Sequence, residues 1–117
     1  MDPLYYAMVG AFFTHEMDAV KRHEWRVLPL LRALPDGIGE HAFIWLHVPL
    51  FALLLLAGDG DPAGAARIGL AAFAIIHVGL HVAFRRHPAY EFNNPSSWGL
   101  ILLTGALGAA YLASLPA

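Results

Sequence analysis

The chain has 117 residues, of which 58% are hydrophobic, 14% are charged and none is cysteine, and its formal net charge is −2. A soluble domain of average composition has roughly 45–50% apolar and about 25% charged residues, so this composition disfavours a soluble enzyme or a disordered chain, and the negative charge disfavours a nucleic-acid-binding protein. The lack of cysteine excludes disulfides, thiolate metal ligands and cysteine nucleophiles, and we expect one domain, residues 1–117, that resides in a membrane.

The first predicted helix, at about residues 3–34, changes character part-way along its length. Residues 3–13 are all apolar, but this stretch is too short to cross a bilayer by itself. The segment Thr14-His15-Glu16-Met17-Asp18, polar except at Met17, follows directly. We therefore expect one long helix whose polar half is shielded by the other helices, with Pro29 kinking its last turns.

Three further helices are predicted, at about residues 39–58, 62–86 and 96–115. Turn-forming segments at residues 35–37 and 58–62 separate them from their neighbours, and the last helix contains no charged residue. At a rise of ~1.5 Å per residue, ~20 residues cross the ~30 Å hydrocarbon core of a bilayer. Four helices joined by short connections predict an all-α integral membrane protein, an up-down-up-down four-helix bundle.

The basic residues predict the orientation of this bundle. Six of the seven lysines and arginines fall at the end that holds the first and third connections, and the seventh, Arg67, lies near the opposite end. The positive-inside rule therefore predicts that the basic end is cytoplasmic and that both termini lie on the non-cytoplasmic side. The six basic residues are Lys21, Arg22, Arg26, Arg32, Arg85 and Arg86.

The histidines all fall in the predicted cytoplasmic half. Helix rise places His15, His47 and His77 at ~12–14 Å from the inner edge, and it places Asp18 and His81 at ~8 Å. His77 and His81 are four residues apart on one helix face, a spacing that lets two imidazoles bind one ion. Ionisable residues inside a bilayer cost roughly 2.5–3.5 kcal/mol each, so such a cluster needs mutual partners or a ligand. The sequence predicts a metal site whose candidate ligands are His15, Asp18, His47, His77 and His81.

Imidazole and carboxylate donors favour zinc, iron, manganese or copper(II) over calcium, magnesium or copper(I), and we expect zinc or iron. Glu16 is the candidate catalytic residue, a general base beside the metal. Glu24 would point away from His15 on a continuous helix, and we expect it to be solvated. The zincin motif His-Glu-x-x-His is absent, because Ala19 stands where its second histidine would be.

Other interpretations of the cluster remain open at this point. The histidines could bind haem b through an axial pair such as His47 and His81, or they could only form hydrogen bonds between helices. The protein could be an enzyme whose hydrophobic small-molecule substrate enters from the lipid bilayer. Alternatively, it could be a non-catalytic part of a homo-oligomer or of a larger membrane complex.

Three segments make the chain resemble a group of small, uncharacterised bacterial integral membrane proteins. That group carries a His-x-x-Glu-Glu motif in its first helix and a helical histidine followed by a Tyr-x-Pro-Gly-like turn. Here the paired glutamates of the motif are replaced by Asp18 and Ala19, and the glycine of the turn is missing. The resemblance implies an active site at the motif and a location in the bacterial inner membrane. The counterparts are His15-Glu16-Met17-Asp18, His77 with His81, and residues 90–95.

Overall fold

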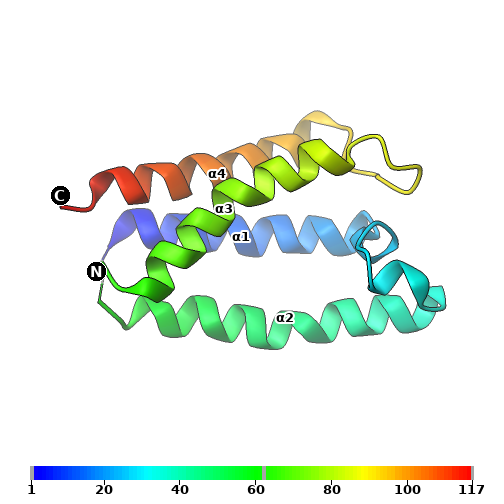
Figure 1. The fold of residues 1–117 in the computed structure, drawn as a ribbon, viewed down its shortest axis with the longest axis horizontal. Helices are drawn as coiled ribbons and strands as arrows, with labels where there is room; N and C mark the ends of the chain where they lie inside the picture. Colours follow the sequence, from blue (N-terminus) through cyan, green and yellow to red (C-terminus); the bar gives the residue numbers. More distant parts are fainter. Residues whose placement is uncertain (1, 62, 117) are drawn as a thin grey trace.

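The computed structural model describes residues 2–61 and 63–116, which form four α-helices in an up-down-up-down bundle (Figure 1). The predicted all-α, four-helix architecture is therefore confirmed. α1 begins and α4 ends at the same end of the bundle (Figure 1). The predicted start of the third helix, residue 62, lies outside the described residues. The elements are α1 (Pro3–Lys21), the 3₁₀ turns η1 (Glu24–Arg26) and η2 (Leu31–Ala33), α2 (Asp36–Gly58), α3 (Ala65–Phe84) and α4 (Pro95–Ser114).

The prediction of one helix over residues 3–34 is wrong in its second half, because α1 ends at Lys21. His23 adopts the left-handed conformation, with φ 56° and ψ 47°, and the chain leaves the helix axis there. Hydrogen bonds to the start of α2 stabilise this turn. The indole N–H of Trp25 donates to Asp36 Oδ1 over 2.9 Å, and Arg26 binds both carboxylate oxygens of Asp36. These bonds tie η1 to the start of α2.

The apolar helices fit a membrane. Within the described residues, α2, α3 and α4 are each long and apolar enough to cross a bilayer, which indicates a membrane location. Large apolar side chains such as Trp45 on α2 and Ile76 on α3 are exposed on the outside of the bundle. α1 lies between α4 and α2 (Figure 1). This position buries His15 and Glu16 and thereby shields the polar part of α1, as the sequence predicted.

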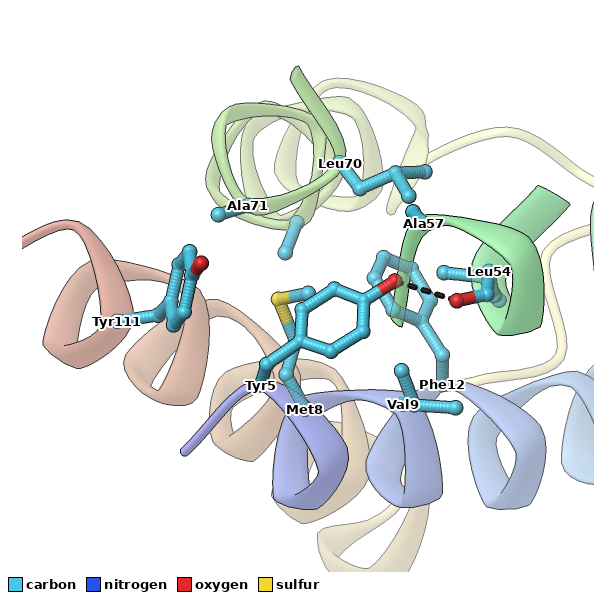
Figure 2. Close-up of a cluster of buried hydrophobic side chains, with 10 residues drawn as sticks. Tyr5, Met8, Val9, Phe12, Leu54, Ala57, Leu70, Ala71 and Tyr111 are labelled. Carbon is cyan, nitrogen blue, oxygen red and sulfur yellow. Dashed lines mark hydrogen bonds between the residues drawn. The ribbon is translucent and has the colours of Figure 1, made fainter. Parts of the chain in front are cut away.

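A buried apolar cluster, here called the upper core, joins all four helices near the beginning of α1 (Figure 2). Within it the Tyr5 hydroxyl donates a hydrogen bond of 2.5 Å to the Leu54 carbonyl oxygen of α2, as Figure 2 shows. A second apolar cluster, the lower core, lies around Trp25, Phe43 and Phe92 toward the opposite end. The polar residues of interest lie between these two cores. The upper core comprises Tyr5, Met8, Val9, Phe12, Leu54, Ala57, Leu70, Ala71, Ala74 and Tyr111.

Candidate metal centre

Three histidines and one glutamate converge inside the bundle. His15 on α1, His77 and His81 on α3, and Glu24 in η1 each offer a ligand atom, and these four atoms all lie within 4.8 Å of one another. The ring centroids of His77 and His81 are 4.5 Å apart, as expected for neighbours one helical turn apart. The ring of His15 lies 4.6 Å from His77 and 5.2 Å from His81. These distances would allow one ion to contact all four side chains.

Several polar atoms of this group have no hydrogen-bond partner within the part of the chain that the structure describes. They are both ring nitrogens of His15, Nδ1 of His77 and Oε2 of Glu24, and all of them are buried. Buried polar groups are nearly always hydrogen-bonded, and each unsatisfied group costs roughly 1–3 kcal/mol. A neutral imidazole has one lone pair, so a bound cation could accept one nitrogen of each histidine and an oxygen of Glu24 as ligands.

Glu24 is the ligand candidate that the sequence did not predict. Its side chain is 14% exposed, and its Oε2 lies 3.9 Å from Nε2 of His15, so the expectation that Glu24 is solvated is wrong. Burial, followed by the negative charge of Glu16, raises the pKa of Glu24 to about 8. A divalent cation beside this carboxyl group would favour its ionised form and so offset the effect of burial.

Tyr90, in the connection between α3 and α4, contacts His81 of the four-residue group. Its hydroxyl oxygen lies 2.9 Å from Nδ1 of His81, which leaves Nε2 of that ring for another partner. Burial, and then the charge of Glu24, raises the pKa of Tyr90 above its usual value, so the phenol remains neutral. Histidine ligands of metals usually have their second ring nitrogen fixed by such a hydrogen bond.

Glu16 and His47 form a separate pair beside the four-residue group. Nε2 of His47 lies 2.5 Å from Oε2 of Glu16, and Nδ1 of His47 lies 2.6 Å from the carbonyl oxygen of Phe43. A carbonyl oxygen can only accept, so Nδ1 carries a proton and a second proton is shared between Nε2 and the Glu16 carboxyl group. Both nitrogens of His47 are therefore engaged. The other oxygen of Glu16, Oε1, lies 4.0 Å from Nε2 of His15.

Asp18 is engaged in a different contact. Its Oδ1 accepts a hydrogen bond of 3.2 Å from Nε of Arg22, and its Oδ2 accepts one of 2.6 Å from the Ser97 hydroxyl. Ser97 lies in the first turn of α4, where its backbone N–H is capped by the Asn94 side chain. Asp18 thus connects α1 to the start of α4.

A cavity of about 230 Å³ adjoins the four-residue group. Its polar lining residues are Glu16, Glu24, the two histidines of α3 and Tyr90, and the others are apolar, including Leu50 of α2. Phe73 and Leu80 of α3 line this cavity and are also 41% and 44% exposed on the outside of the bundle. The cavity therefore reaches the face of α3 that would meet lipid.

Residues 1–117 match a family of unknown function, DUF6713. The chain belongs to this family. No curated protein and no solved structure matches it.

The structure of this DUF6713 chain places the residues predicted as metal ligands in three different settings. His15, His77 and His81 lie together, whereas His47 is paired with Glu16, and Asp18 is paired with α4. Glu24 completes the first group from η1. No signal in the sequence would have identified Glu24 without knowledge of where α1 ends.

Proposed function

We propose that this chain is a membrane protein that binds a transition metal ion, zinc or iron, through His15, His77, His81 and Glu24. The observation that carries the proposal is the convergence of four ligand atoms from three segments, with buried lone pairs that lack other partners. Three imidazoles and one carboxylate without thiolates suit zinc or iron rather than calcium or copper(I). Asp18 and His47 hold the surrounding helices and are not ligands in this proposal.

The surroundings of the site support a metal-dependent enzyme with a hydrophobic substrate. A bound metal would polarise a carbonyl group or activate water. Glu16 lines the cavity next to His15, so it is placed to accept a proton from a molecule in the cavity as a general base. His47 contacts its other carboxylate oxygen, Oε2. The cavity reaches the lipid-facing side of α3, which gives an apolar substrate a route into the site. The resemblance of residues 15–18 to a His-x-x-Glu-Glu motif agrees with this assignment.

We place the protein in the bacterial inner membrane, with the metal in its cytoplasmic half. Arg26 and Arg85 lie at the end of the bundle that holds η1 and the α3–α4 connection, and the positive-inside rule assigns this end to the cytoplasm. Haem is less well supported. The expected axial pair, His47 and His81, is not available, because Glu16 and a backbone carbonyl occupy both nitrogens of His47.

Elemental analysis and a visible spectrum of the detergent-purified protein test the proposal. We expect about one zinc or iron ion per chain in the wild type, and a loss of that metal in His77→Ala and His81→Ala. His41→Ala is the matched control, because His41 is an exposed histidine on α2. Circular dichroism and gel filtration in detergent would show that the variants still form the helical bundle.

Four results would count against this function. Full metal occupancy in both alanine variants would exclude the assigned ligands, and a metal-free, folded wild type after loading would exclude the site. A Soret band would identify haem iron instead. Co-purification of a fixed partner in gentle detergent would favour the alternative, a non-catalytic subunit of a larger membrane complex.

A further inference from the structure

The cavity follows one face of α3. Its lining residues on this helix run from Phe73 to Phe84, which corresponds to ~16 Å along the helix axis at 1.5 Å per residue. His77 and His81 lie in the middle of this row, with Phe73 before them and Phe84 after them. The polar part of the wall is therefore flanked on α3 by aromatic side chains on both sides.

Residues at each end of the cavity pack against one of the two apolar cores. Leu50 of α2 lines the cavity and packs against the upper core, and Phe73 stacks on Phe12 of that core at a centroid distance of 6.1 Å. Leu28, in the link after η1, lines the cavity and packs with Phe84 against the lower core. Apolar surface thus extends from the metal-binding group toward both cores.

The size of the cavity limits what it can hold. Pockets for drug-sized ligands have volumes of about 300–1,000 Å³, whereas this cavity has about 230 Å³. A small volume distributed along ~16 Å of helix fits one slender hydrocarbon chain rather than a ring system or a lipid with two chains. The exposed faces of Phe73 and Leu80 are the place where such a chain would enter from the bilayer.

We infer that the substrate is a single straight hydrocarbon chain with an oxygen-containing group, such as a carbonyl, ester or hydroxyl, part-way along its length. This inference rests on the proposed function, because the oxygen group would meet the metal ion between His77 and His81. A chain with its polar group in the middle places hydrocarbon against both apolar ends of the cavity. A polar end group pushed into either end would lose its hydrogen bonds to water without gaining a partner.

A pair of isomeric straight-chain ketones tests this inference. One isomer has its carbonyl at mid-chain and the other has it next to the end, so both partition almost equally into detergent micelles. The protein is loaded with cobalt(II), whose visible spectrum reports an oxygen ligand at the metal. We expect the mid-chain ketone to change this spectrum at a concentration about tenfold lower than its isomer does, because only its carbonyl reaches the metal with both halves buried.

Variants that fill one end of the cavity test whether the bound chain occupies both ends. Leu50→Phe narrows the end near the upper core and Leu28→Phe narrows the end near the lower core. Each substitution should weaken binding of the mid-chain ketone by about tenfold, the loss that corresponds to two buried methylene groups. Ile76→Phe is the control, because Ile76 is exposed on α3 and does not line the cavity. It should leave binding unchanged.

Elemental analysis of the same samples shows whether the inference alone fails or the proposed function fails with it. If cobalt is bound and the terminal ketone binds as well as or better than the mid-chain ketone, the inference is overturned and the proposed function stands. The same holds if only one of the two wall variants weakens binding. If the wild type binds no cobalt, zinc or iron, the proposed function fails and the inference fails with it.

Discussion

Oε2 of Glu24 lies 3.9 Å from Nε2 of His15, although the two residues would face opposite sides of a continuous helix. A separation of nine residues at 3.6 residues per turn amounts to two and a half turns, so a regular helix would point them apart. The left-handed residue His23 ends the helical path and returns Glu24 toward α1. The candidate metal centre therefore depends on a backbone turn as much as on its ligands.

We expect the stability of the metal-free protein to fall as pH rises, because of Glu24. The pKa of this carboxyl group is raised from 4.5 to about 8, so the native state holds the proton more tightly than the unfolded state does. The contribution of protonated Glu24 to the stability of the native state is complete below pH 4.5, and it is lost as the pH rises through about 8. Thermal unfolding in detergent across this range measures it. Glu24→Gln, which cannot ionise, should give a flatter curve, and an equally steep curve would contradict the assignment.

Tyr90→Phe should weaken metal binding while the bundle still folds. The substitution removes the hydroxyl that lies 2.9 Å from Nδ1 of His81 but keeps the buried ring. Loss of such a supporting hydrogen bond typically reduces metal affinity by about 10–100-fold. Titration against a chelator of known affinity measures this change. Tyr5→Phe is the matched control, because it also removes a buried hydrogen bond, but in the upper core. Equal affinities in the two variants would disprove the role of Tyr90.

Asp18→Asn distinguishes a structural carboxylate from a ligand. We expect this variant to keep its full metal content and to lose about 1–2 kcal/mol of stability, because Asp18 accepts hydrogen bonds from Arg22 and Ser97. Ser97→Ala removes the partner hydroxyl and should cost a similar amount. The double variant should cost less than the sum of the two, since both remove one interaction. Loss of metal from a folded Asp18→Asn protein would show that Asp18 is a ligand after all.

The side chains that both the sequence and the structure bring together are placed by short-range geometry. His77 and His81 share one helix face because they are four residues apart, and helix rise alone placed His15 at a similar depth. The long apolar runs of α2, α3 and α4 likewise predict helices, because length and composition along the chain suffice to identify them. The place of Glu24 in the candidate metal centre depends on contacts between separate elements, such as those of Asp36 in α2 with η1. Single-sequence reasoning has no access to such contacts.

The partners of the remaining polar residues could not be predicted for a related reason. Helix rise predicts a level in the bundle for Asp18 and His47, but level does not fix the rotation of each helix about its axis. The contacts of α1 with α2 bring Glu16 to His47, and its contacts with α4 bring Asp18 to Ser97. Neither contact is encoded in spacing along one helix.

Substitutions at His23 should affect the metal site through the backbone. Asparagine also tolerates the left-handed conformation, so His23→Asn should retain metal binding. A β-branched residue does not tolerate it, so His23→Ile should destabilise the turn by about 1–2 kcal/mol and displace Glu24. Metal affinity and thermal unfolding of both variants measure this effect. If His23→Ile binds metal as tightly as His23→Asn does, the turn does not position Glu24.

The position of α3, which carries two of the ligands, depends on its close approach to α4 at Gly108. A Cβ added at Gly108 would lie 2.8 Å from the Ala71 carbonyl oxygen and 2.9 Å from Cβ of Ala74, so the helices would have to separate. Gly108→Ala should therefore cost about 1–3 kcal/mol and weaken metal binding. Gly99→Ala, on the same helix with nothing within 4 Å of the new atom, should be neutral or slightly stabilising. Thermal unfolding and metal titration compare the two. If they behave alike, close packing of α3 on α4 does not hold the histidines in place.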